Sequence, residues 1–314
     1  MPYSELEKKR KVALLKVCVL IIFQLALLSL FFVIGLNSDT LKLLITINMI
    51  SFFVVFCVID TMYVKFEKEV KQNLIQNILE NILQNDGCVT WSEGGDEETE
   101  NILRVASNYI DEDIESILRD AGNYIDDVKI LFSCYEDSHP REVYLGIYKN
   151  QKFKLAEYHI IRGVGRNKYI FLRGNVIKIP LKNNYSGQIV VGKRKLIARQ
   201  PWEHWFNFRL KRIKINKIFT NGRNLYSNGI DNFDEILTPC FVEFVNSLPK
   251  KCQVSIVNNN LYIIYSTNRD TFKLGSLWRK IDDPKQYERF RKDLFYALDI
   301  VERASKISIV DKTL

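Results

Sequence analysis

The sequence predicts an α+β protein, in which an N-terminal two-helix transmembrane hairpin precedes a cytosolic domain with a mainly antiparallel sheet and covering helices. Three observations lead to this prediction. Two long apolar runs lie close together near the N-terminus. Many short segments rich in Ile, Val, Tyr and Phe follow, and turn residues separate them. Two helical segments near the C-terminus each open with a capping residue and a proline.

The two apolar runs predict transmembrane helices over residues 12–36 and 43–64. A helix rises about 1.5 Å per residue and a hydrocarbon core is about 30 Å thick, so each run is long enough to cross it. The link at 37–42 is so short that the helices must be antiparallel neighbours. The first run is too long for a cleaved signal peptide, and a second run follows it. We expect Asn48 to hydrogen-bond to Gln24 across the hairpin.

Basic residues around the hairpin predict its orientation, because cytosolic flanks of membrane helices carry excess Lys and Arg. The flanks hold Lys8, Lys9, Arg10, Lys11, Lys65, Lys68 and Lys71, whereas the link carries Lys42 alone. The sequence therefore predicts a two-pass protein of the cytoplasmic membrane, with a cytosolic N-terminal segment 1–11, an external link and a cytosolic C-terminus. Much of the net charge of +8 then reflects topology, which disfavours a nucleic-acid partner.

Residues 65–127 are expected to form an amphipathic helix followed by an acidic helical and loop segment. Apolar residues recur at helical spacing over 66–84, which predicts that the second membrane helix continues there or hinges near Lys65. Residues 85–101 contain two glycines and an acidic cluster, which favours a loop. Short helices are expected at 102–106 and 113–120.

Residues 128–314 are expected to form the α+β cytosolic domain, in which short connections favour antiparallel pairing. Strands are predicted at 128–135, 142–148, 152–161, 168–172, 176–180, 188–191, 194–198, 210–218, 253–257 and 261–265. Turns are expected at Gly174-Asn175 and at 182–184. A further turn at Asn258-Asn259-Asn260 would close a hairpin between the last two strands.

Two helices are expected to cover the sheet. Thr238-Pro239 supplies an N-cap and a first-turn proline, which predicts a helix through Val245. Asp283-Pro284 opens a longer helix in the same way, and this helix is expected to end near Ser305. Its apolar side is expected to hold Phe290, Leu294, Phe295, Leu298 and Val301.

No arrangement of residues in the sequence predicts catalysis. The three histidines lie in separate segments, and the six cysteines form no C-x-x-C pair. We therefore predict no catalytic, metal-binding or cofactor-binding residue, and we interpret His159 as a structural residue of a strand. This favours a non-catalytic binding or scaffold domain at the inner leaflet. The alternative is a membrane-tethered enzyme whose site is assembled in three dimensions.

One basic and aromatic segment is the candidate for contact with a membrane surface or a partner. Its residues, here called the basic–aromatic patch, are Lys193, Arg194, Lys195, Arg199, Trp202, Trp205, Arg209, Lys211 and Arg212. Such surfaces bind anionic lipid, with the aromatic side chains at the interface. The same composition also fits a basic strand pair whose aromatic side chains fill the core. The partners we expect are the lipid bilayer and either a protein partner or a second copy of the chain.

Four phrases of the sequence form an ordered set. They are FLRGNV at 171–176, YSGQIVV at 185–191, EILTP at 235–239 and LFYALDIV at 294–301. In order and spacing, the chain from about Lys129 onward resembles a bacterial membrane family known as domain of unknown function 3137, which shares the hairpin architecture. The resemblance implies a bacterial cytoplasmic-membrane setting. The family has no agreed catalytic residues, so the resemblance implies none for this chain.

Overall fold

The computed structural model describes residues 3–33, 38–83, 87–93, 140–162, 169–192, 211–213, 218–228, 233, 235–267, 269–272, 274, 280–281 and 283–307. The expected helices at 102–106 and 113–120 and the expected strands at 128–135 and 194–198 lie outside these ranges. The chain divides into two compact units. The first comprises Met1–Ile78 with Lys273–Phe290, and the second comprises Leu79–Phe272 with Arg291–Leu314.

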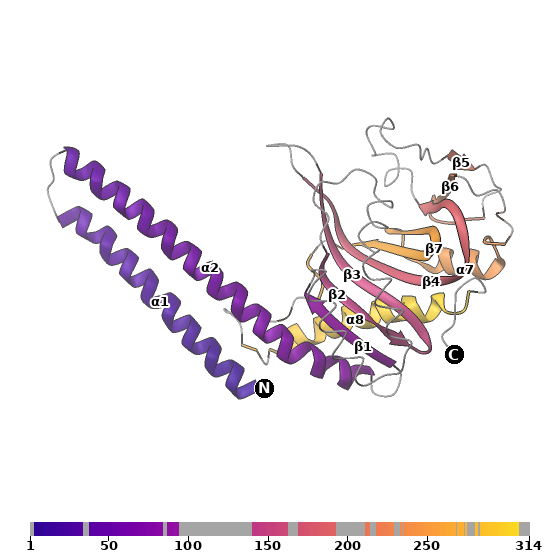
Figure 1. Ribbon diagram of the computed structural model, residues 1–314, viewed down its shortest axis with the longest axis horizontal. Helices are drawn as coiled ribbons and strands as arrows, with labels where there is room; N and C mark the ends of the chain where they lie inside the picture. The colour runs from indigo at the N-terminus through magenta and orange to yellow at the C-terminus, as the bar shows by residue number, and fades with distance from the viewer. Residues whose placement is uncertain are drawn as a thin grey trace. The chain divides into compact units, whose positions relative to one another are not determined.

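The first unit contains a pair of long helices, α1 (Tyr3–Val33) and α2 (Ser38–Leu83), which run side by side in opposite directions (Figure 1). Both are long and apolar enough to cross a membrane, over Ser4–Ser29 with a mean hydropathy of 2.5 and over Ile45–Ile75 with a mean hydropathy of 2.0. As expected, α2 does not end with the apolar run: it continues as one helix of 46 residues.

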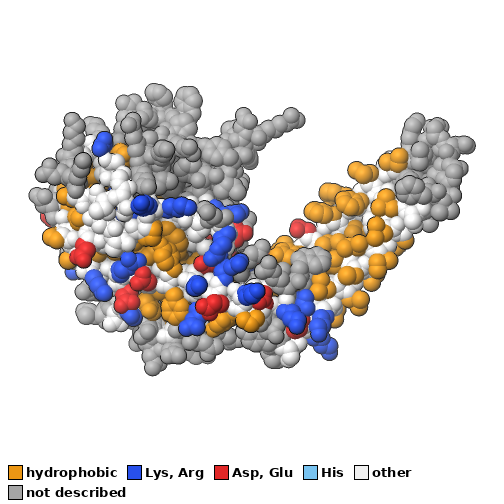
Figure 2. Space-filling view, turned by 180° about the vertical axis from the view of Figure 1, so that it is seen from behind, with side chains coloured by type: hydrophobic (Ala, Val, Ile, Leu, Met, Phe, Trp, Pro, Cys, Tyr) orange, Lys and Arg blue, Asp and Glu red, His pale blue; other side chains and the backbone are white. Residues whose placement is uncertain are grey.

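Apolar side chains cover the outside of this hairpin (Figure 2). Phe53 and Met49 are each 67% exposed, which is the reverse of what a core helix of a soluble protein shows. The polar side chains Gln24, Asn48 and Ser51 lie between the helices instead. Gln24 donates a hydrogen bond to Asn48 Oδ1 at 2.8 Å, and Ser51 donates one to Gln24 Oε1 at 2.9 Å. The expected bond between Gln24 and Asn48 is confirmed.

Polar contacts, among them one ion pair between the two helices, gather near the start of α1. Lys9 pairs with Glu69 of α2, and Arg10 donates two hydrogen bonds to Glu7, at 2.9 and 2.6 Å. A Glu7 carboxylate oxygen also accepts the backbone N–H of Ile281 at 3.3 Å. The first unit is therefore polar where α1 begins and apolar along most of its described length.

The second unit is built on a sheet in which the structure describes seven antiparallel strands. They are β1 (Gly87–Glu93), β2 (Pro140–Tyr148), β3 (Gln151–Arg162), β4 (Tyr169–Gly192), β5 (Lys211–Ile213), β6 (Asn224–Asn228) and β7 (Cys252–Ser266). The order is β1-β2-β3-β4-β6-β5, and β7 pairs with β4 off this path (Figure 1). The prediction of an α+β protein with a mainly antiparallel sheet is confirmed.

The long strands β4 and β7 differ from the expectation of short strands and turns. The predicted turn at Gly174-Asn175 is wrong, because Gly174 lies inside β4 opposite Ser266 of β7. A Cβ at Gly174 would stand 2.2 Å from the carbonyl oxygen of Tyr265, so glycine here permits close strand contact and not a turn.

The predicted turns at 182–184 and at Asn258-Asn259-Asn260 are also wrong. The register moves from Pro180 to Tyr185 along β4 while it moves only from Asn260 to Asn258 along β7. The extra residues of β4 form a bulge, and bulges bend a strand without ending it. The asparagines of β7 stay in the strand opposite this bulge, so β7 is one strand and not a hairpin.

The expectation of a loop over 85–101 is wrong for Gly87–Glu93, which forms the edge strand β1 and pairs with β2. Its alternation of small polar residues with Val89 and Trp91 is strand-like, and both of these side chains are buried. The Trp91 indole N–H donates a hydrogen bond to the Glu142 carboxylate at 2.5 Å. The sequence-based prediction missed this short strand because the glycines and acidic residues that follow it indicate a loop.

Both predicted helices of the second half are confirmed. The first, α7 (Pro239–Ser247), has Thr238 as its N-cap, whose hydroxyl accepts the Phe241 N–H at 3.3 Å. The second, α8 (Pro284–Ala304), buries Leu294, Leu298 and Val301 completely. The expectation for Phe295 is wrong, because this side chain is 38% exposed and lies against the guanidinium of Arg291.

Within the second unit, α8 lies beside the sheet (Figure 1), and polar contacts fix its position. Lys149, in the turn between β2 and β3, forms an ion pair with Glu302 at 2.8 Å. Arg303 donates a hydrogen bond to Ser247 of α7 at 3.2 Å. The ring of Tyr296 meets that of Tyr265 of β7 edge to face, with centroids 5.3 Å apart. These contacts bring α7, β7 and α8 together at one place.

Candidate functional site

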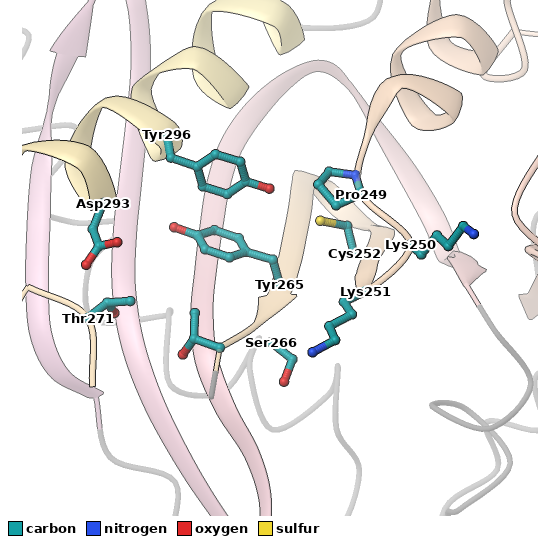
Figure 3. Close-up of a pocket in the computed structure, with 10 residues that line it drawn as sticks. Pro249, Lys250, Lys251, Cys252, Tyr265, Ser266, Thr271, Asp293 and Tyr296 are labelled. Atoms are coloured by element: carbon teal, nitrogen blue, oxygen red, sulfur yellow. The ribbon is translucent and has the colours of Figure 1, made fainter. Parts of the chain in front are cut away.

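A pocket of about 330 Å³ lies where α7, β7 and α8 meet, inside the second unit (Figure 3). Four chain segments supply its walls: the turn after α7, the end of β7, the segment after β7, and α8. The lining residues are Pro249, Lys250, Lys251, Cys252, Tyr265, Ser266, Thr267, Thr271, Asp293 and Tyr296. The sequence did not indicate this pocket, because its residues are far apart in the chain and match no known motif.

Arg223 holds the turn that forms one wall of the pocket. Its buried guanidinium donates hydrogen bonds to the carbonyl oxygens of Val245 at 2.9 Å, Leu248 at 2.8 Å and Pro249 at 2.5 Å. These are carbonyls at the C-terminal end of α7, where a helix lacks internal partners and favours a cation. Burial lowers the pKa of Arg223. The side chain thereby fixes the path of the chain into Cys252.

Cys252 and Tyr296 form the inner part of the pocket, where the Tyr296 hydroxyl points toward the Cys252 sulfur (Figure 3). Burial raises the pKa of the Cys252 thiol to about 11, although the Tyr296 hydroxyl and the charges of Arg223 and Arg303 oppose this. Burial likewise raises the pKa of the Tyr296 hydroxyl. A thiol that stays protonated near neutral pH is a poor nucleophile, because the thiolate is the reactive form.

Asp293 is the carboxylate of the pocket, and it is already neutralised. Arg269 donates two hydrogen bonds to it, at 2.9 and 2.8 Å, in the bidentate geometry that makes such pairs strong. On the other side of Asp293, Thr271 donates its hydroxyl proton to Asn175 Oδ1 at 2.9 Å. This end of the pocket therefore carries little net charge.

A pair of buried carboxylates lies behind Thr271. Glu142 of β2 and Glu157 of β3 are directly opposite each other, and they are 4% and 2% exposed. The Thr271 N–H donates to Glu157 at 2.7 Å. Burial raises the pKa of Glu157 from 4.5 to about 7, and the negative charges of Asp270 and Glu142 act in the same direction.

Phe272 adopts an unusual backbone conformation beside this pair. Its φ of 52° lies in the left-handed region, which costs about 1–2 kcal/mol for a residue with a side chain. The fully buried ring packs against Tyr144 with centroids 4.8 Å apart, and this burial offsets the cost. The turn at Phe272 directs the N–H of Thr271 toward Glu157. A hydrogen bond therefore connects the pocket wall to the carboxylate pair.

The basic–aromatic patch is mostly outside the described part of the chain. Of its nine residues, the structure describes the side chain of Arg212, which is exposed and donates a hydrogen bond to Asn224 at 2.6 Å. Lys211 begins β5, and the other seven residues lie outside the described ranges, as do His139 and His204. The patch and the pocket share no residue, and the assignment of the patch stays a prediction.

Comparison with known proteins gives one family. Residues 170–305 match the model of the family described as protein of unknown function (DUF3137). This confirms the family resemblance, and the matched DUF3137 segment contains β4, β6, α7, β7 and α8, and with them the whole pocket.

Two further comparisons add little. No curated protein matches the chain. A crystal structure of the mycobacterial trehalose monomycolate transport factor A, TtfA, is similar with a TM-score of 0.34 and 9% identity, over 74% of this chain and 96% of that one. A similarity at this level has no bearing on what this chain does.

Proposed function

We propose that this protein is anchored in a bacterial cytoplasmic membrane by α1 and α2 and presents a non-catalytic binding or scaffold domain at the inner leaflet. The observation that carries the proposal is the inverted hairpin. Its apolar side chains face outward, while Gln24, Asn48 and Ser51 hydrogen-bond to one another between the helices. In water this arrangement would expose a large apolar surface, whereas in lipid it satisfies both kinds of side chain.

The proposed orientation places both termini in the cytosol. Its support is the basic flanks of the hairpin, since short cytosolic segments of membrane proteins are rich in Lys and Arg. The segments proposed on the two sides are 1–11 and 65–127 inside and 37–42 outside, with the α+β domain 128–314 inside.

Extraction and fusion experiments test anchoring and orientation separately. The full chain should stay in the membrane pellet after an alkaline carbonate wash. Green fluorescent protein fused after Leu314 should fluoresce, and alkaline phosphatase fused at the same position should be inactive. Release by carbonate would refute the anchor, and an active phosphatase would refute the orientation.

The non-catalytic role is supported by the chemistry of the pocket. The raised pKa keeps the Cys252 thiol protonated, and Asp293 is bound by Arg269. Neither group is therefore prepared for nucleophilic or acid–base chemistry.

The basic–aromatic patch is the proposed contact surface for anionic lipid. The full chain in phosphatidylcholine nanodiscs should bind vesicles that contain phosphatidylglycerol. Each basic residue near such a surface contributes about 1 kcal/mol, so charge reversal at Lys193, Arg194 and Lys195 should weaken binding at least 100-fold. Charge reversal at the exposed Lys182 is the matched control. Unchanged binding in the triple variant would exclude the patch.

The enzyme alternative has one observation in its favour. A buried carboxyl with a pKa of about 7 is suited to general acid–base work, and Glu157 is such a group. Glu157, however, does not line the pocket; it contacts the pocket wall at Thr271, whose N–H donates to its carboxylate at 2.7 Å. An activity that survives in Glu157→Gln would remove this support.

A further inference from the structure

The pocket joins three features that the proposed anchoring and scaffold role does not use. The first is exposed aromatic surface. Among the described residues outside α1 and α2, Phe295 and Tyr296 are the only large apolar side chains that are markedly exposed, at 38% and 37%. Tyr296 lines the pocket, whereas Phe295 precedes it in α8, is not among the lining residues and lies against Arg291. Exposed aromatic side chains beside a pocket are typical of ligand sites.

The second feature is the aromatic pair inside the pocket. Tyr265 and Tyr296 meet at an interplanar angle of 79°, so the two rings do not stack on each other. The open space of the pocket lies beside them, with Cys252 and Pro249 on the opposite wall (Figure 3). An apolar ring of a ligand would pack against both tyrosines and the protonated thiol.

The third feature is an unbalanced positive charge. Lys251 extends across the pocket toward Ser266, whereas Lys250 points away from it (Figure 3). Neither lysine has an ion-pair partner among the residues that the structure describes. The charge of Arg223 adds to the positive potential at Cys252, whereas that of Arg303 is offset by its ion pair with Asp299 at 2.7 Å. Since Asp293 is neutralised by Arg269, no free carboxylate in the pocket opposes this potential.

The neighbouring hydroxyl groups explain why Lys251 is the group that would bind an anion. Ser266 donates its proton to the carbonyl oxygen of Arg173, and Thr267 donates to that of Arg269. Their protons are therefore in use within the protein. The ammonium group of Lys251 has three protons to donate and is exposed to solvent.

We propose that this pocket binds a small organic anion with a flat apolar body: the anionic group lies at Lys251, and the body lies against Tyr265, Tyr296 and Cys252. The volume of about 330 Å³ is at the small end of the range of about 300–1,000 Å³ for ligand sites. It fits one ring with a charged substituent and excludes a dinucleotide. Phosphate monoesters and carboxylates share the required chemistry.

Phenyl phosphate is the probe that tests this proposal, because it combines one aromatic ring with one phosphate. Calorimetric titration uses the full chain in phosphatidylcholine nanodiscs, with inorganic phosphate and phenol as probes of charge alone and ring alone. Phenyl phosphate should bind at least tenfold more tightly than either of them. Equal or undetectable binding of all three probes would overturn the proposal, even if membrane anchoring is confirmed.

Two neighbouring lysines provide a matched pair of variants. Lys251→Gln should weaken phenyl phosphate binding at least tenfold, because a hydrogen bond to an ionised group is lost. Lys250→Gln removes the same charge one residue away and should leave the affinity within twofold of the wild type. Tyr296→Leu should weaken binding through its loss of ring contact. Equal effects of the two lysine variants would show nonspecific charge attraction and would overturn the site.

Cys252 reports on occupancy without any substitution. Because the Cys252 thiol is buried and protonated near neutral pH, iodoacetamide alkylation is run at about pH 9 for long enough to modify Cys252 measurably without a probe; mass spectrometry follows each cysteine, with the exposed Cys240 as the internal control. Phenyl phosphate should slow alkylation of Cys252 several-fold and leave Cys240 unchanged. Parallel slowing at both cysteines, or none at Cys252, would place the probe elsewhere.

The natural source of the anion is resolved by the lipid composition of the nanodisc. A lipid head group is the ligand if two results are found together. Phenyl phosphate should bind wild type more weakly in phosphatidylglycerol nanodiscs than in phosphatidylcholine nanodiscs, and Lys251→Gln should show no such difference. Where the affinity is the same in both lipids, the pocket binds a soluble anion. Both results retain the site and differ only in the compartment that supplies the ligand.

Discussion

The hairpin and the sheet unit arrange the same kinds of side chain in opposite ways. In the hairpin, apolar side chains such as Met49 face outward and Gln24 is 5% exposed. In the sheet unit, Leu298 and Ile263 are completely buried, while Lys182 faces water. Each region places against its surroundings the groups that those surroundings solvate best. The difference teaches that the exposed fraction of a side chain must be interpreted separately in each region, because exposure to lipid favours apolar groups and exposure to water favours polar groups.

The largest effect expected from this comparison comes from matched leucine truncations. Leu298→Ala leaves a cavity in the core of the sheet unit, and should lower the free energy of unfolding by about 2–5 kcal/mol. Leu25→Ala, at a position 59% exposed on the hairpin, should change it by less than about 0.5 kcal/mol. Denaturant titration in detergent, followed by tryptophan fluorescence, measures both. Equal losses would contradict the view that the hairpin exterior faces lipid.

A second test removes the cation at the end of α7. Arg223→Met retains an apolar stem but removes one donor from each of three carbonyl oxygens, of which those of Val245 and Pro249 keep a backbone donor, and this should cost about 2–4 kcal/mol. Arg212→Met removes an exposed guanidinium that has one hydrogen-bond partner among the described residues, and should cost less than about 1 kcal/mol. If both variants unfold at the same denaturant concentration, the proposed role of Arg223 in holding the Pro249 turn is wrong.

The buried carboxyl of Glu157 predicts a pH dependence. Its pKa is about 7 in the folded protein against 4.5 ordinarily, so the folded protein holds this proton more tightly than the unfolded chain does. The resulting stabilisation is fully present below about pH 4.5 and is lost as the pH rises through 7. Glu157→Gln cannot ionise, so its stability relative to wild type should rise between pH 5 and pH 8, by about 2–3 kcal/mol.

Unfolding curves of wild type and variant at pH 5 and pH 8 measure this difference. Glu243→Gln, at an exposed position of α7, is the control and should follow wild type at both values. A constant difference between Glu157→Gln and wild type across this range would show that Glu157 is ionised throughout.

The smallest effect is expected inside the hairpin. Gln24→Leu and Asn48→Leu each remove one partner of the interhelical hydrogen bond, and the coupling energy between them should be about 0.6–1.7 kcal/mol. A double-mutant cycle in detergent measures it. Replacing both residues together should recover part of the loss, because neither partner of this bond is then left facing an unpaired one, while Ser51 loses its acceptor on Gln24 in both Gln24→Leu backgrounds. A coupling energy of zero would show that the two side chains do not interact.

The elements that the sequence predicted well are those with local signals. The caps at Thr238 and Asp283 and the hydrophobic length of α1 and α2 each depend on a few neighbouring residues. The bond between Gln24 and Asn48 was also predictable, because a short link leaves two polar side chains few other partners.

The errors arose where partner strands decide the outcome. Gly174 indicates a turn when it is considered alone, and only the close approach of Tyr265 and Ser266 shows why a strand requires it. Asn258-Asn259-Asn260 looks like a turn, yet the bulge of β4 keeps it extended. The pocket was not predictable for the same reason: Lys251, Tyr265 and Tyr296 meet only because of long-range pairing and the packing of α8.

The unbroken course of α2 has a consequence for any change made along it. Its 46 residues contain no glycine or proline, the usual causes of a sharp kink. A helix turns by about 100° per residue. One alanine inserted after Val64 would therefore rotate the rest of α2, residues 65–83, by that angle relative to the apolar run. Four inserted residues would nearly restore the original phase. The helix therefore couples the rotational setting of its apolar half to that of its amphipathic half.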